Sequence, residues 1–180
     1  MTSEEFYSLT KVYTDFPKKG VNFLDLSPVL ASSQDFCELT NDIAHSMIYL
    51  GAGNAVKVVG IESRGFIAAT YVASSVVASL VLCRKKGKLP GEVISQSYEK
   101  EYGTDELCIQ KGLIEEGDQV VIVDDVLATG GTIEAVVNIV KQFKPSRISV
   151  LVLAEIEGLK GREVLDRLGV NYEILYSQCL

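Results

Sequence analysis

The chain has 180 residues, of which 47% are hydrophobic, and its 17 Lys and Arg residues against 24 Asp and Glu residues give a formal net charge of −7. A chain of this length can bury roughly 70% of the surface that it exposes when unfolded, so we expect residues 1–180 to form a single domain that needs no disulfide or metal to fold. The acidic charge argues against a nucleic-acid partner and against a polybasic membrane surface, because both require an excess of Lys and Arg.

The first 33 residues are expected to form a hood over a sheet, because a short amphipathic helix is followed by Pro17, Gly20 and Pro28. The residues directly after Met1 are polar and acidic rather than basic and then apolar, so no secretory signal is expected. Four scattered cysteines and a single histidine favour a reducing, cytoplasmic setting without structural zinc.

Helical and strand-like patterns alternate through the rest of the chain. Apolar residues recur at helical spacing over residues 36–50, 66–77 and 132–143, and short apolar runs occupy residues 56–61, 80–83, 120–123 and 148–153. Such runs, rich in Val and Ile, are typical of strands that are covered on both faces. The pattern predicts an α/β fold with an open, mainly parallel twisted sheet and helices on both faces.

Residues 84–112 interrupt this alternation. They are polar and contain Gly87, Pro90, Gly91 and Gly103, which favours either a long loop or a loose antiparallel hairpin beyond the sheet.

Residues 65–83 carry no charge over 19 positions, which is long enough to suggest a membrane span. Thr70, Ser74 and Ser79 interrupt the stretch, and its end resembles a short buried strand that follows a helix. We therefore expect no membrane span here.

Two common phosphate-binding motifs fail when they are compared with the chain. Gly51 and Gly53 have no glycine partner at position 56 and no strand before them. Gly112 and Gly117 have the spacing of a nucleoside-triphosphate loop, but Asp118 stands where that loop requires lysine. Both pairs are interpreted as turns.

The most informative stretch is residues 120–132, where four apolar residues are followed by Asp124 and Asp125 and then by a loop of small and hydroxylated residues that enters a helix. This places the carboxylates at the carboxyl edge of the sheet, where open α/β folds bind ligands. The backbone N–H groups of the loop and the positive end of the helix suit a phosphate monoester, whereas carboxylates accept hydrogen bonds from hydroxyls. The combination indicates a sugar phosphate. The alternative, a turn with solvated carboxylates, is disfavoured because two acids after a buried strand cost stability unless they are used.

Residues 120–132 resemble the signature of type I phosphoribosyltransferases, which use 5-phosphoribosyl 1-pyrophosphate. Further blocks, in the family's order, resemble the adenine phosphoribosyltransferases and occupy residues 15–23, 58–66, 84–91, 98–103 and 159–163. The blocks at 84–91 and 101–103 are the ones that narrow the resemblance to the adenine subgroup. The resemblance implies a purine salvage enzyme that converts adenine and phosphoribosyl pyrophosphate to AMP and pyrophosphate, with Mg²⁺ as cofactor and a homodimer as the assembly.

The resemblance also implies roles for individual residues. The 5′-phosphate loop would be Ala128, Thr129, Gly130, Gly131 and Thr132, and Asp124 and Asp125 would hold the ribose hydroxyls. The pyrophosphate would be bound by Glu62, Ser63, Arg64, Arg84, Lys85 and Lys88, in a region where this family often has a cis peptide bond and where a neighbouring subunit contributes one residue. Glu101 would act on the base, and residues 97–102, which include Tyr102, would form a mobile lid over the reaction centre. Mg²⁺ would be held mainly by substrate and water, so few direct protein ligands are expected.

The adenine site would be formed by Val21, Phe23 and Leu24. Many family members have arginine at the position of Leu24, and leucine cannot donate a hydrogen bond. Adenine recognition is therefore expected from backbone groups, notably those of Val21, and Phe23 is expected to stack on the ring. Leu24→Arg is expected to change the adenine KM by no more than a few fold.

Two alternatives stay open at this point. A relative with the same fold could act on guanine, hypoxanthine or another base. A non-catalytic regulator could sense phosphoribosyl pyrophosphate through the same site and bind nucleic acid or protein, although the charge of −7 and the lid disfavour it.

Overall fold

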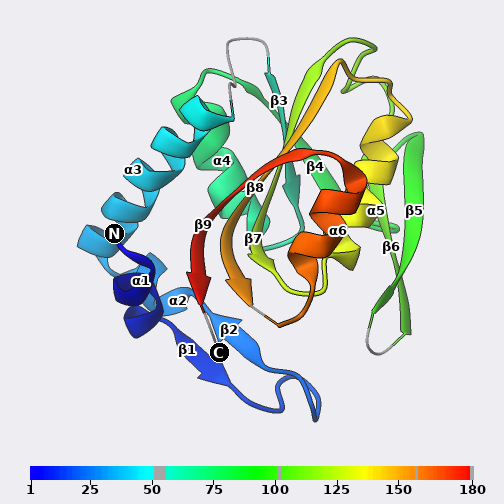
Figure 1. Cartoon of the computed structure of the whole chain (residues 1–180). Helices are drawn as coiled ribbons and strands as arrows, with labels where there is room; N and C mark the ends of the chain where they lie inside the picture. Colours follow the sequence, from blue (N-terminus) through cyan, green and yellow to red (C-terminus); the bar gives the residue numbers. More distant parts are fainter. Residues whose placement is uncertain (51–55, 101–102, 157, 179–180) are drawn as a thin grey trace.

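The computed structural model describes residues 1–50, 56–100, 103–156 and 158–178. Across these residues a seven-stranded sheet has the order β5-β6-β4-β3-β7-β8-β9 (Figure 1). Strands β4, β3, β7, β8 and β9 run parallel, while β6 is antiparallel to β4, and β5 to β6. The predicted open, mainly parallel sheet is confirmed. Its strands are β3 (Val56–Ile61), β4 (Ser79–Lys85), β5 (Val93–Lys100), β6 (Gly103–Gln110), β7 (Gln119–Leu127), β8 (Arg147–Ile156) and β9 (Asn171–Gln178).

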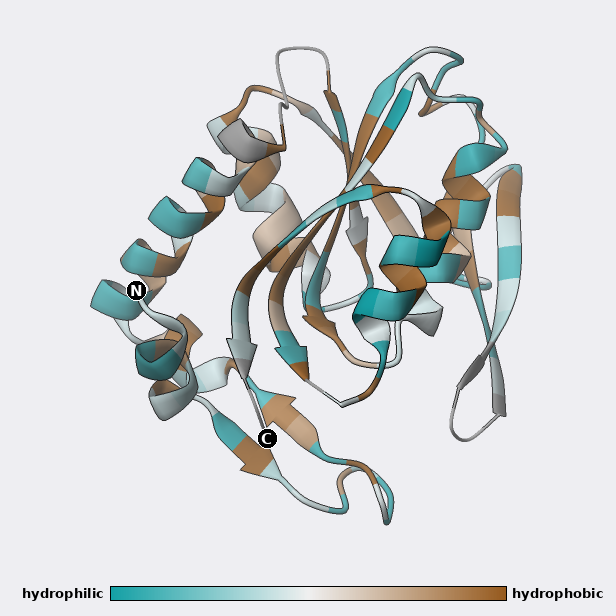
Figure 2. Cartoon of the chain, viewed as in Figure 1, coloured by the Kyte–Doolittle hydropathy of each residue, from teal (hydrophilic) through white to brown (hydrophobic). Residues whose placement is uncertain are grey.

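Helices cover both faces of this sheet. On one face lie α3 (Ser33–Tyr49) and α4 (Gly65–Ser75), and on the other lie α5 (Gly131–Lys141) and α6 (Gly161–Leu168) (Figure 1). Each face has its own cluster of buried apolar side chains. The outer sides of α3 and α6 are hydrophilic and their inner sides are hydrophobic (Figure 2), as expected of helices that pack on a sheet. The stretch at 65–83 folds as α4 followed by β4, and none of the described helices is long and apolar enough to cross a membrane.

The hood, residues 1–33, contains α1 (Ser3–Leu9), a separate two-stranded sheet of β1 (Lys11–Tyr13) and β2 (Phe23–Asp25), and α2 (Ser27–Ala31). Its small sheet lies beyond the ends toward which β7, β8 and β9 point (Figure 1). Residues 84–112 contain the antiparallel hairpin of β5 and β6, so the hairpin alternative for this segment is correct.

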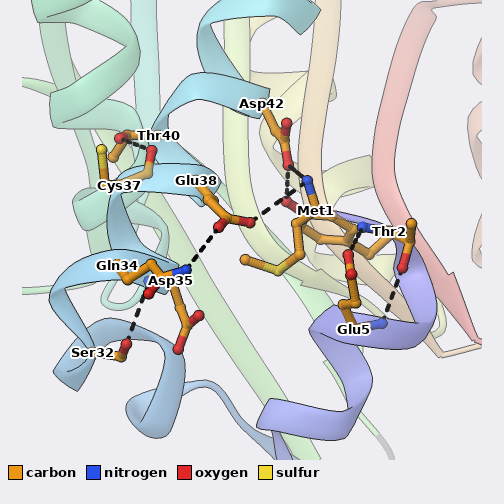
Figure 3. A network of polar contacts seen from close by, with 11 residues as sticks. Met1, Thr2, Glu5, Ser32, Gln34, Asp35, Cys37, Glu38, Thr40 and Asp42 are labelled. Carbon is orange, nitrogen blue, oxygen red and sulfur yellow. Dashed lines mark hydrogen bonds and ion pairs between the residues drawn. The ribbon is translucent and has the colours of Figure 1, made fainter.

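The N-terminal end of the hood is held against α3 and β9. The amine of Met1 donates to Asp42 Oδ2 at 3.2 Å and lies 4.0 Å from Glu38 Oε2, and the side chains of Thr2 and Glu5 close the first turn of α1 (Figure 3). Asp42 also accepts the Tyr176 hydroxyl at 2.6 Å. These contacts attach the start of the chain to the main sheet and its α3 layer.

Close packing of α4 on β3, together with the greater length of β7, shapes the carboxyl edge of the sheet. A Cβ on Gly60 of β3 would lie 2.7 Å from the Ala69 Cβ of α4, so glycine allows this helix to lie directly on the strand. The pairing of β3 with β7 ends at Gly60 and Val123, whereas β7 continues to Leu127 beside β8. The last residues of β7 therefore pass the end of β3 and face the space beneath the hood.

Candidate active site

A cleft of about 480 Å³ lies between the hood and the carboxyl edge of the sheet. Three segments that are far apart in the sequence supply most of its lining: the end of β2, the turn between β3 and α4, and the end of β7 with the loop that follows. The lining residues are Asn22, Phe23, Leu24, Glu62, Ser63, Arg64, Lys85, Tyr98, Leu107, Asp124, Asp125, Val126, Ala128, Thr132 and Ile156.

The two carboxylates are buried at the end of β7, and each residue is only 8% exposed. Asp124 Oδ1 accepts the backbone N–H of Asp125 at 3.0 Å. Burial, together with the neighbouring Asp125 carboxylate, raises the pKa of Asp124 well above its usual value. Asp125 Oδ2 is buried with no hydrogen-bond partner, although Arg64 Nε lies 2.5 Å away as its ion-pair partner. The alternative of a turn with solvated carboxylates is therefore wrong, and the pair is available for hydroxyl donors.

The loop of residues 128–132 connects β7 to α5. Gly130 has a φ of +85° at the N-cap position, a conformation that L side chains rarely adopt. No side chain caps α5, so its first backbone N–H groups remain available to an anion, as at other helix N-termini that bind phosphate. Ala128 and Thr132 line the cleft, whereas Thr129, Gly130 and Gly131 support the turn without lining it.

The turn between β3 and α4 contains a cis peptide bond between Glu62 and Ser63, as the resemblance implied. The Glu62 carboxylate accepts Arg84 Nη2 at 3.1 Å, Arg84 Nε at 3.3 Å and the backbone N–H of Lys85 at 3.0 Å. Partial burial acts to raise the pKa of Glu62, but these hydrogen bonds outweigh it and hold the pKa below its usual value. Glu62 thus anchors the start of the basic loop, 84–91.

Arg64 connects three parts of the cleft. Its Nη1 donates to the Leu24 carbonyl at 2.8 Å, and its guanidinium lies 4.6 Å from the centre of the Phe23 ring. Its Nε pairs with Asp125. The residue expected to bind pyrophosphate therefore also joins the hood to the carboxylates of β7.

The basic residues of 84–91 are placed unequally. Lys85 lines the cleft and pairs with Asp105 Oδ2 of β6 at 3.3 Å. Arg84 pairs with Glu62 and donates to the Lys88 carbonyl at 3.1 Å. Neither Arg84 nor Lys88 lines the cleft of this single chain.

The expected adenine residues also differ in placement. Phe23 lines the cleft. Leu24 contributes to the lining, but it is 4% exposed and packs in the cluster that includes α3 and α4 residues. Val21 does not line the cleft, and its N–H donates to Lys18 while its carbonyl accepts from Phe16 within the hood. The expectation that Val21 supplies backbone recognition is thus weakened by the local use of both groups.

Sequence reasoning assigned no role to four of the lining residues, Asn22, Val126, Leu107 and Ile156, and it placed Tyr98 in the lid without a role. Asn22 lies between Val21 and Phe23, and Val126 follows Asp125, so their position beside predicted site residues could have pointed to them. Ile156 has no such signal, because only the pairing of β8 with β7 brings it to this edge. Glu101 and Tyr102 lie outside the described residues.

Among the residues that the structure describes, no group of three or more His, Cys, Asp and Glu side chains could hold a metal ion. The cleft does contain oxygen donors of the kind that Mg²⁺ prefers, at Asp124 and Asp125. The buried Oδ2 of Asp125, which accepts no hydrogen bond, fits an acceptor for a substrate hydroxyl or for a water bound to the metal.

Comparison with known proteins identifies this arrangement. Residues 31–173 match the phosphoribosyl transferase domain family. Adenine phosphoribosyltransferase from Mycoplasmopsis pulmonis is 42% identical over 171 residues, covering 95% of this chain and 96% of that protein, and the enzyme of the same name from Geobacter metallireducens is 43% identical over 162 residues, covering 90% and 93%. The structure of APRTase from Giardia lamblia, complexed with 9-deazaadenine, superposes with a TM-score of 0.91 at 34% identity and covers 100% of this chain and 99% of that one. The chain therefore belongs to the adenine phosphoribosyltransferase family.

Proposed function

We propose that this protein transfers the 5-phosphoribosyl group from phosphoribosyl pyrophosphate to adenine, which gives AMP and pyrophosphate. The observation that carries the proposal is the single cleft in which two buried carboxylates, a loop at a helix N-terminus and an aromatic hood residue meet. The family relationship supports the same reaction. The solved structure of adenine phosphoribosyltransferase from Saccharomyces cerevisiae is a complex that includes adenine.

The site residues act on a reaction that builds opposite charges. The C1–O bond breaks, and its electron pair leaves with pyrophosphate. Adenine N9 bonds to C1 from the opposite face, so the anomeric configuration is inverted, and the N9 proton passes to solvent. Asp124 and Asp125 accept the ribose hydroxyls near the developing cation, and residues 128–132 hold the 5′-phosphate. Phe23 stacks on the base, and Glu101 holds or protonates the N7 region.

The leaving group carries several negative charges. Arg64, Lys85 and Lys88, with the turn at Glu62 and Ser63, supply donors and positive charge for it. Mg²⁺ on the pyrophosphate oxygens would neutralise part of this charge. The hairpin of β5 and β6 acts as the lid that excludes water from the ribosyl cation.

We also propose a single domain, a homodimer and a cytoplasmic location. Hood residues Phe6, Leu24 and Val29 share one apolar cluster with Val58 of β3 and Leu153 of β8, which supports one domain over residues 1–180. Among described residues Cys37, Cys83 and Cys108 are free thiols, which suits a reducing compartment.

A panel of bases tests the proposed reaction. The protein is incubated with Mg²⁺, radiolabelled phosphoribosyl pyrophosphate and adenine, hypoxanthine or guanine, and nucleotide formation is measured. We expect adenine to be preferred by at least roughly tenfold in kcat/KM, because a mismatched exocyclic group leaves buried polar groups unsatisfied at about 1–3 kcal/mol each. A better rate with hypoxanthine or guanine would show that the base is misassigned, and binding without turnover of any base would favour a regulator.

A further inference from the structure

The block at residues 159–163 resembles the family, but the proposed reaction gives it no task. It leads into α6, and this helix lies directly on the phosphate loop. A Cβ on Gly161 would lie 2.5 Å from the Ala128 carbonyl oxygen, and one on Gly130 would lie 2.9 Å from the Val164 Cβ. The position of α6 therefore limits the conformations that residues 128–132 can adopt.

The first turn of α6 is attached to the sheet by an ion pair in which the Glu155 side chain is 5% exposed and the Arg162 side chain is 45% exposed. Arg162 Nε lies 2.6 Å from Glu155 Oε2, and Arg162 Nη2 donates to Ser177 Oγ at 2.7 Å. Ser177 Oγ in turn donates to the same Glu155 oxygen at 3.2 Å. Glu155 is 4% exposed at the end of β8, so its carboxylate depends on these partners. The three side chains join α6 to β8 and β9.

We propose that the Arg162–Glu155 pair is a positioning device, which holds α6 against residues 128–132 and so fixes the loop in the shape that binds a 5′-phosphate. The inference rests on the proposed function, because the 5′-phosphate site is part of it. Arg162 acts through the backbone of its neighbour Gly161 and does not touch the substrate. Several backbone N–H groups must converge on one phosphate, so a displacement of about 1 Å loses hydrogen bonds that define the site.

The same helix offers a matched control. Arg167, five positions later, pairs with Glu134 of α5 at 2.7 Å, but the two side chains are 64% and 36% exposed. An exposed ion pair contributes little to stability. Arg167→Gln therefore removes an arginine and an ion pair from α6 without releasing its first turn from β8.

The test measures binding of ribose 5-phosphate by calorimetry, in the intact protein and in four variants. We expect Arg162→Gln to raise the Kd about fivefold or more and Arg162→Lys to recover part of the loss, because lysine keeps the charge but not the fork of donors. Gly161→Ala should raise the Kd at least as much, since the added Cβ meets the Ala128 carbonyl. Arg167→Gln should stay within about twofold. In turnover, the KM for phosphoribosyl pyrophosphate should rise by the same factor while the KM for adenine stays within about twofold.

An unchanged Kd in Arg162→Gln would overturn the inference, as would an equal loss in Arg167→Gln. If Arg162→Gln does not fold, Gly161→Ala and Arg162→Lys decide the question by the same comparison. Failure of the proposed function is recognised separately: a parent protein that binds ribose 5-phosphate without converting adenine refutes the reaction, while the comparison of Kd values still tests the positioning role.

Discussion

Arg64 shows how one side chain serves several parts of the cleft. It contacts the Leu24 carbonyl, the Phe23 ring and the Asp125 carboxylate at the same time. A planar guanidinium with five donors can make these contacts together, whereas a lysine ammonium cannot. The residue therefore links the regions that are expected to bind the base, the ribose and the pyrophosphate.

Asp124 gives the first prediction. A carboxyl group whose pKa is raised by burial and by Asp125 destabilises the folded protein at pH values above its unfolded pKa, which is near 3.8. Asp124→Asn removes this cost, so the Tm at pH 7 should rise, by roughly 2–4 °C for each kcal/mol recovered. The difference from the parent protein should vanish as the pH falls below about 4, where the carboxyl is protonated in both states. Activity should fall at the same time, because the charge that costs stability is the one that serves the reaction.

Thermal melts on both sides of pH 4, from about pH 3 to pH 8, measure this effect. Glu92→Gln is the control, because the Glu92 side chain is 81% exposed and its charge costs little on folding. A Tm for Asp124→Asn that is lower than that of the parent protein at pH 7 would contradict the prediction.

Leu24 gives the second prediction. Its side chain is 4% exposed in the core, so Leu24→Arg would bury a cation without a partner and should destabilise the protein by on the order of 3 kcal/mol or more. Leu24→Met keeps the volume and should cost less than about 1.5 kcal/mol. Denaturant unfolding measures both. The expectation from sequence, a modest change in adenine KM, stays a prediction, and the burial of Leu24 adds an expected loss of stability to it. A Leu24→Arg protein as stable as the parent protein would contradict the expected destabilisation.

At the scale of elements, the basic loop 84–91 depends on contacts with two other segments. Glu62, from the turn after β3, holds both Arg84 and the backbone of Lys85. Lys86 and Lys85 pair with Glu106 and Asp105 of β6. The loop therefore presents its positive charge from a fixed base between the central sheet and the hairpin.

Lys88 gives the third prediction. Lys88→Ala should weaken binding of phosphoribosyl pyrophosphate and of pyrophosphate, and the difference from the parent protein should shrink as salt is added, because an exposed charge is screened. Adenine binding should be nearly unchanged. Lys86→Ala is the matched control from the same loop, since Lys86 is already paired with Glu106 at 2.8 Å. Titration calorimetry at two salt concentrations measures these effects, and an equal loss for adenine would indicate a folding defect instead.

At the scale of the whole molecule, α4 and β4 leave apolar side chains exposed on one face. Leu80 and Leu82 pair in register with Val58 and Gly60, which places them on the α4 side of the sheet, and they are 39% and 37% exposed. Ile67 of α4 is 44% exposed. Exposed apolar side chains on neighbouring elements suit an interface with a second copy, which supports the proposed homodimer.

The dimer gives the fourth prediction. Leu82→Glu should shift the protein toward the monomer in sedimentation velocity, because a charge on the interface must be desolvated on association. The KM for phosphoribosyl pyrophosphate should rise as well, if the neighbouring subunit completes the pyrophosphate site. Leu113→Glu is the control, since Leu113 is similarly exposed at 41% in the turn before β7. A monomeric parent protein would refute the proposal.

The sequence by itself determined the features that depend on local pattern. Apolar runs identified β3, β4, β7 and β8. Strands covered on both faces need such runs, which accounts for β3, β7 and β8, whereas Leu80 and Leu82 of β4 stay partly exposed. Asp124 and Asp125 followed by a small-residue loop indicated the ligand edge, since that combination is costly without a ligand. The edge strand β9 was not predicted, because its mixed sequence has no continuous apolar run.

The tertiary structure decided which groups those residues actually meet. Leu24 is buried because its position in β2 points into the α3 and α4 layer, and both backbone groups of Val21 are used within the hood. Arg64 reaches a carbonyl 40 positions away, and Arg162 of α6 reaches a carboxylate on β8. Such partners come from segments that only packing brings together, and their choice depends on burial and geometry that local periodicity does not encode.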